Sequence, residues 1–75
     1  MEQVLQILSA VRPDVDFETE TALIDDGVLD SFDIVAIVGD LNDAFGIEIT
    51  VEELEPENFN SAEAIYALVQ KLLEE

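Results

Sequence analysis

The sequence contains no cysteine, no histidine and no tryptophan, and it has only two basic side chains, Arg12 and Lys71. Without cysteine the chain can form neither a disulfide nor a thiolate nucleophile. Without histidine it lacks the side chain that most often acts as a general base at neutral pH. Because binding to the phosphates of nucleic acids depends on lysine and arginine, nucleic acid is a poor partner. The absences therefore argue against catalysis and against nucleic-acid binding.

The residues that are present make an acidic but apolar chain. Nineteen carboxylates give a net charge of −17, while 49% of the residues are hydrophobic, too many for a disordered acidic tail. Seventy-five residues suffice for one domain, so we treat residues 1–75 as a single unit. We expect a cytoplasmic monomer that does not insert into membranes, because no signal-peptide pattern and no apolar run of roughly 20 residues occurs. Its charge attracts basic protein surfaces.

Apolar side chains at helical spacing predict three main helices, at residues 2–11, 31–45 and 61–73. Gly46 is expected to end the second helix. For the third, Asn60 is the expected N-cap, with Glu63 completing a capping box. The predicted fold is all-α, a small three- to four-helix bundle with a long loop between the first two helices. Its core positions are Val4, Ile7, Leu8, Val11, Ile34, Ile37, Val38, Leu41, Phe45, Ile65, Leu68, Val69 and Leu72.

The connections are predicted from their apolar residues. Residues 12–30 form an unusually long loop, which we expect its own side chains to hold, with a helical turn near residues 20–24. Residues 47–51 alternate like a strand, but a single strand has nothing to pair with, so an extended linker with Ile47, Ile49 and Val51 inward is expected. A short turn capped by Thr50 and another begun by Pro56 should follow. The expected loop anchors are Val15, Phe17, Leu23, Ile24, Val28 and Leu29.

Ser31 stands where the second helix is predicted to begin, next to Asp30. Free backbone N–H groups and the positive end of the helix dipole favour an anion there, and Gly27 allows the chain to turn sharply. On its own, the pattern predicts only that Ser31 or Asp30 caps the helix. A nucleophilic Ser31 would need a base to take its proton, and no histidine is present.

Asp14, Asp16, Glu18 and Glu20 alternate like the start of a calcium-binding loop. The pattern then fails, because the positions that require glycine and a bidentate glutamate hold Thr19 and Asp25. We therefore expect no specific metal site.

Phe32 and Val35 lie off the predicted core face of the helix at residues 31–45. Grouped exposed apolar side chains often mark an interaction site. Either they dock a partner or the loop at residues 12–30 folds over them. The sequence leaves both alternatives open.

The run Asp26-Gly27-Val28-Leu29-Asp30-Ser31-Phe32 and the downstream Ile47-x-Ile49 resemble the acyl and peptidyl carrier proteins. The resemblance covers the whole chain, including its length, its acidity, the helix order and the long first loop. Phe32 stands where that family usually has leucine. The Gly-Val-Leu-Asp-Ser run is most similar to D-alanyl carriers and to stand-alone carriers of amino-acid-activating systems.

The resemblance implies that Ser31 receives 4′-phosphopantetheine from coenzyme A and that the thiol of this arm carries an acyl or aminoacyl group. It implies that Asp30 helps to engage the phosphopantetheinyl transferase. The other implied partners are an acyl- or aminoacyl-activating ligase and a downstream acyltransferase or synthase with basic docking surfaces. The remaining alternative is an acidic interaction module without a prosthetic group. The residues expected to contact partners are Phe32, Asp33, Val35, Asp40, Asp43 and Glu48.

Overall fold

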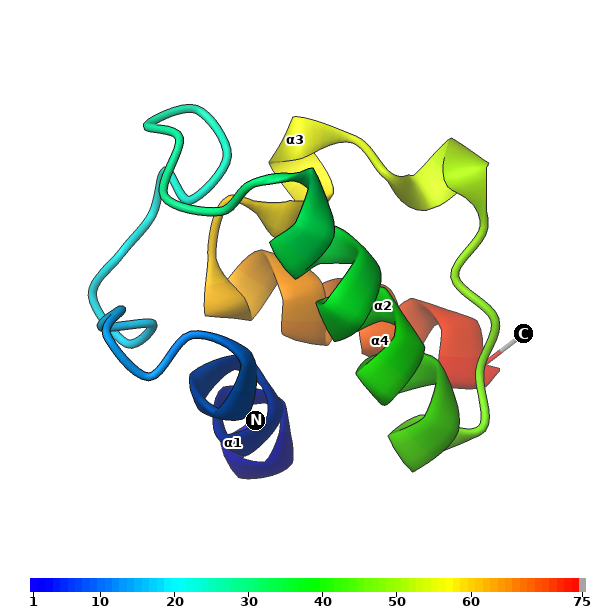
Figure 1. Ribbon diagram of the computed structural model, residues 1–75. Coiled ribbons are helices and arrows are strands. Elements are labelled where there is room, and N and C mark those ends of the chain that lie inside the picture. Colours follow the sequence, from blue (N-terminus) through cyan, green and yellow to red (C-terminus); the bar gives the residue numbers. More distant parts are fainter. Residues whose placement is uncertain (75) are drawn as a thin grey trace.

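A computed structural model of the chain, described for residues 1–74, is built from helices. The helices are α1 (Glu2–Val11), α2 (Ser31–Phe45), α3 (Pro56–Phe59) and α4 (Ala62–Glu74), and a 3₁₀ turn, η1, spans Val51–Glu53. α2 packs on α1 and α4, α1 also packs on α4, and the short α3 packs on α4 (Figure 1). The predicted all-α bundle with a long first loop is confirmed. No described helix has both the length and the apolar character needed to cross a membrane.

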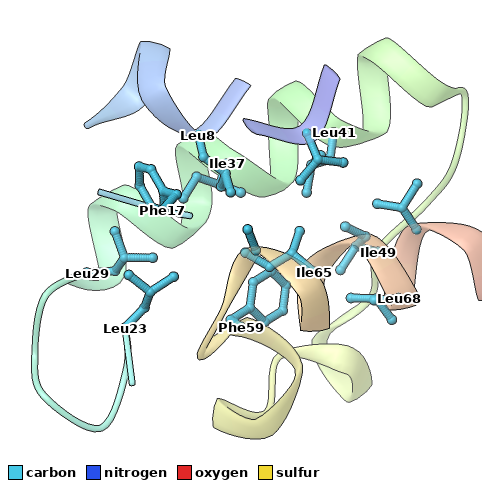
Figure 2. Close-up of a cluster of buried hydrophobic side chains, with 13 residues drawn as sticks. Leu8, Phe17, Leu23, Leu29, Ile37, Leu41, Ile49, Phe59, Ile65 and Leu68 are labelled. Carbon is cyan, nitrogen blue, oxygen red and sulfur yellow. The ribbon is translucent and has the colours of Figure 1, made fainter. Parts of the chain in front are cut away.

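The core is purely apolar and draws on every part of the chain. It contains no buried polar or charged residue among those described. The long loop contributes Phe17, Leu23 and Leu29, and Figure 2 shows the last two together at one end of the cluster. Burying each side chain contributes roughly 1.5–3 kcal/mol. The predicted anchoring of the loop at residues 12–30 is therefore confirmed. The buried set is Val4, Leu8, Phe17, Leu23, Leu29, Ile37, Leu41, Ile49, Phe59, Ala62, Ile65, Leu68 and Val69.

The segment between α2 and α4 follows the expected path with one correction. α2 ends at Gly46, whose φ of 64° is left-handed and suits glycine. The backbone at residues 47–50 forms no strand, as predicted, and Ile49 is buried. Thr50 is the N-cap residue of η1, as predicted, and its amide donates to the Glu53 carboxylate at 3.1 Å. Val51, however, is 84% exposed, because it starts the 3₁₀ turn instead of continuing the inward alternation of the linker.

The predicted cap of the last helix is wrong. The Oγ of Ser61 accepts a hydrogen bond of 3.0 Å from the amide of Ala64, and the helix begins at Ala62. Asn60 and Ser61 are both good N-cap residues, so sequence preference alone did not separate them. The side chain of Asn60 is used elsewhere, on the loop that leads to Ser31.

Candidate functional site

Ser31 is the first residue of α2 and is exposed, while Asp30 is the N-cap. The Asp30 carboxylate accepts a hydrogen bond of 2.9 Å from the amide of Asp33. The Asp33 carboxylate accepts one of 3.3 Å from the amide of Asp30. This reciprocal capping box fixes the first turn and assigns the capping role, which the sequence left open between two residues, to Asp30. The Ser31 hydroxyl therefore lies at the helix N-terminus without serving as its cap.

A closed turn delivers the chain to Ser31. The amide of Asp26 bonds to the carbonyl of Ala22, and the amide of Leu29 bonds to the carbonyl of Leu23 at 3.0 Å. Gly27 has a φ of 70°, a left-handed conformation that suits glycine and provides the sharp turn expected there. The helical turn expected at residues 20–24 lies about two residues later, at 22–26. The two ends of this turn are thus held together a few residues before Ser31.

Asn60 attaches this turn to the junction of α3 and α4. Its side-chain oxygen accepts hydrogen bonds from the amides of Ile24 at 3.0 Å and Asp25 at 3.1 Å. Its backbone carbonyl accepts a third from the amide of Leu23 at 2.8 Å. One residue thereby satisfies three consecutive backbone donors in a segment that has no regular secondary structure. The turn is consequently fixed to the rest of the bundle.

Arg12, directly after α1, attaches the other side of the loop. Its Nη1 donates to the carbonyl of Val28 at 2.9 Å and to the Asp33 carboxylate at 2.6 Å. Its Nε and Nη2 donate to the Asp14 carboxylate at 3.0 and 2.9 Å. We call this arrangement, Arg12 with Val28, Asp33 and Asp14, the arginine clasp. It joins the end of α1, the last part of the loop and the first turn of α2.

The clasp also keeps its carboxylates ionised. Partial burial alone would raise the pKa of Asp33, but hydrogen bonds from Arg12 and from the Asp30 amide outweigh this and lower it. The hydrogen bond from Arg12 is the main reason that the pKa of Asp14 is lowered. The guanidinium pKa is raised in turn, chiefly by hydrogen bonds to Asp14 and then Asp33. An ionised Asp33 thus accepts from both the clasp and the capping box.

The residues expected to contact partners differ in their surroundings. Phe32 is 85% exposed and Val35 is 70% exposed, so the loop at residues 12–30 does not cover them. Asp40, Asp43 and Glu48 are exposed as well.

Asp33 differs from the other five. Its side chain is only 16% exposed, and its carboxylate already binds Arg12 and the Asp30 amide. Asp33 is therefore occupied within the protein and is not available to contact a docking partner.

A small apolar groove opens one turn from Ser31. Ile34 of α2 forms one wall, Ile24 of the loop another, and Leu54, Glu55, Pro56 and Phe59 complete it, enclosing about 110 Å³. That volume is well below the roughly 300–1,000 Å³ of typical small-molecule pockets. The groove can shelter a few atoms beside the helix N-terminus, but not a large ligand.

Comparison with known proteins identifies the chain. Residues 2–69 match the family model described as the phosphopantetheine attachment site. The chain is also similar to the D-alanyl carrier proteins of Lactococcus lactis subsp. cremoris strain MG1363, at 29% identity, and L. lactis subsp. lactis strain IL1403, at 30% identity. Each alignment covers 99% of this chain and 96% of the relative. The chain belongs to the phosphopantetheine-attachment family.

Membership of this family means that the chain is a carrier protein and not an enzyme. The prosthetic group is 4′-phosphopantetheine, which is attached covalently and supplies a thiol that the sequence itself lacks. The site fits such a group, because an exposed hydroxyl at a helix N-terminus suits a phosphate ester. The alternative of an acidic module without a prosthetic group therefore fails. Carriers of this kind work with phosphopantetheinyl transferases and activating ligases.

Sequence reasoning missed two residues that shape this site, Arg12 and Asn60. A signal for Arg12 was available, since a single arginine in a chain of net charge −17 is certain to find carboxylates nearby. For Asn60 the sequence gave a misleading signal, because its position before the last helix matched a local capping pattern. Its real partners are 35 and 36 residues away along the chain.

Proposed function

We propose that this protein carries an acyl or aminoacyl group as a thioester on a 4′-phosphopantetheine arm attached to Ser31. The observation that supports Ser31 most directly is its exposed place as the first residue of α2, with capping left to Asp30. In the transfer, the Ser31 oxygen forms a bond to the phosphopantetheine phosphorus of coenzyme A. The bond from that phosphorus to adenosine 3′,5′-bisphosphate breaks, and the transferase accepts the hydroxyl proton. The chain contributes position and no base, in keeping with its lack of histidine.

Intact mass tests the attachment. The apo chain is incubated with coenzyme A and a broad-specificity phosphopantetheinyl transferase. We expect one phosphopantetheine group to be added to the wild type and none to Ser31→Ala. Ser61→Ala serves as the matched control, because Ser61 also lies beside a helix N-terminus. Addition to the Ser31→Ala variant would show that another residue is the attachment point.

We propose that partners dock on the outward face of α2, defined here as Phe32, Val35, Asp40 and Asp43, together with Glu48 just beyond the helix. Phe32 and Val35 supply an exposed apolar anchor beside Ser31. The carboxylates lie toward the other end of the helix, where they can steer a basic partner surface. A carrier must be released by each enzyme in turn, and a small anchor with a charged surround suits weak, fast association.

The role of Phe32 is tested by the rate of cargo transfer from the loaded carrier to each cognate enzyme. Truncating an exposed anchor to alanine is expected to lower kcat/KM by about tenfold, in the range of interface anchors, with no loss of thermal stability. Val51→Ala provides the control, since Val51 is equally exposed but lies outside α2. Unchanged transfer in Phe32→Ala with every cognate enzyme would refute docking through this side chain.

We propose further that the cargo is small, such as the D-alanyl group named for the Lactococcus lactis relatives. The groove beside Ser31 encloses only about 110 Å³, too little to bury a long acyl chain. A propionyl and a decanoyl thioester, which lack the activating α-amino group and differ only in chain length, should therefore show equal sensitivity to hydroxylamine, which cleaves exposed thioesters. Clear protection of the decanoyl form would contradict a small-cargo carrier.

A further inference from the structure

We propose that Arg12 is the positioning residue for attachment of the prosthetic group. It would hold the segment Val28–Asp33 in the arrangement that the transferase recognises. This inference rests on the proposed attachment at Ser31 and adds a residue that lies 19 positions earlier in the chain. Arg12 acts through the arginine clasp and not by contact with the reacting atoms.

The clasp joins the end of α1 to the segment just before Ser31 and to the first turn of α2 just after it. The Arg12 amide closes the end of α1 by bonding to the carbonyl of Leu8 at 2.9 Å. The guanidinium then reaches the carbonyl of Val28, three residues before Ser31, and the carboxylate of Asp33, two residues after it. Both ion pairs found among residues 1–74 involve this side chain. Ser31 is therefore bracketed by two contacts from one rigid group.

Repulsion between two carboxylates at the start of α2 makes the contacts from Arg12 important. Asp30 and Asp33 exchange side-chain and backbone hydrogen bonds, so their carboxylates lie close together at the start of α2. In a chain of net charge −17, Arg12 supplies the positive charge that offsets their repulsion. Removing that charge favours arrangements in which the capping box opens and the segment before Ser31 leaves its place. A lysine can restore one contact, but it lacks the planar fork with which arginine bonds several acceptors at once.

A transferase that recognises one arrangement of this segment binds only the fraction of carrier molecules that adopt it. The apparent KM for the carrier rises as that fraction falls, while saturation with carrier restores the rate. A residue that only stabilises the fold would leave KM unchanged wherever the protein stays folded. The separation of KM from kcat therefore distinguishes positioning from general stabilisation.

The experiment measures steady-state transfer of phosphopantetheine to the apo carrier, at a temperature at which circular dichroism shows each variant folded. For Arg12→Gln we expect the KM for the carrier to rise about fivefold with kcat within about twofold, and for Arg12→Lys an intermediate KM. Asp14→Ala is the matched control, because it removes the exposed arm of the clasp and leaves the contacts to Val28 and Asp33. Its KM should stay near that of the wild type. In an Asp33→Asn background the effect of Arg12→Gln should shrink, since the two residues act as a pair.

Hydrogen exchange of the isolated carrier gives a second measurement that does not depend on the transferase. In Arg12→Gln the amides of Asp30 and Asp33 should exchange faster, while those of Ile24 and Asp25, held by Asn60, should not change. An unchanged KM, or a fall in kcat alone, would overturn the role of Arg12 even if Ser31 is modified normally. Absence of modification in the wild type would instead overturn the attachment itself, and this proposal with it.

Discussion

The Asn60 side chain offers the sharpest test of how the loop is held. Asn60→Ala removes three side-chain hydrogen bonds, two from backbone amides and one to the Asp25 carboxylate at 3.2 Å. The half-buried Ile24 amide loses its partner, at a cost of about 1–1.5 kcal/mol, whereas the exposed Asp25 groups can bond to water and cost about 0.5 kcal/mol together. We therefore expect the free energy of unfolding to fall by about 2 kcal/mol.

Urea and thermal denaturation followed by circular dichroism measure this change. For a domain of this size, a loss of about 2 kcal/mol corresponds to a Tm lower by about 8–16 °C. Asn58→Ala is a suitable control, because Asn58 makes a single side-chain hydrogen bond, to the carbonyl of Glu53 at 2.9 Å. It should cost about 1 kcal/mol or less.

Amide exchange shows whether the loss occurs in the loop or in the helix. In Asn60→Ala, protection should fall at Ile24 and Asp25, and the start of α4 should be unaffected. Ser61→Ala should do the reverse, exposing the Ala64 amide at a cost of about 1 kcal/mol. A stability of Asn60→Ala within about 0.5 kcal/mol of the wild type would refute the reasoning. A loss of amide protection confined to the start of α4 would also refute it, because that result is expected if Asn60 were the N-cap, as the sequence predicted.

Three further substitutions test other features. Gly46→Ala should lower the free energy of unfolding by about 1 kcal/mol, since its φ of 64° is unfavourable for alanine although the added methyl meets no atom. Gly39→Ala should instead raise it by about 1 kcal/mol, because Gly39 lies within α2 and has equally open surroundings; urea denaturation giving the same sign for both would contradict this. A hydrogen bond with Glu57, and then repulsion by its charge, raise the pKa of Glu55 in the folded state above its ordinary 4.5. The folded state is therefore penalised above that raised pKa, so Glu55→Gln should have the higher Tm at neutral pH and lose its advantage below about pH 4.5; a pH-independent difference would contradict the assignment.

The helices and the serine could be predicted because their determinants are local. Apolar spacing placed α1 and α2 at their observed bounds, and Gly46 marked the end of α2. The same spacing directed Phe32 and Val35 away from the core face, but only the structure shows that the loop at residues 12–30 leaves them exposed.

Where two residues suit a role equally well by their local sequence, only the tertiary structure shows which one fills it. Asn60 and Ser61 are both good caps, and the tertiary position of the loop decided which one serves α4. Val51 continues an apolar alternation, but the 3₁₀ turn directs it to solvent.

The sequence by itself determined an acidic, all-α bundle with a serine at the start of its second helix, because helical periodicity, turn chemistry and charge act over a few residues; the carrier role came from resemblance to a known family. Tertiary structure decided how the loop before that serine is held. Asn60 meets its partners across 35 and 36 residues, and Arg12 meets Val28 and Asp33 across 16 and 21. No local pattern encodes such contacts, since they exist only once burial of Leu23 and Leu29 has brought the loop against the helices.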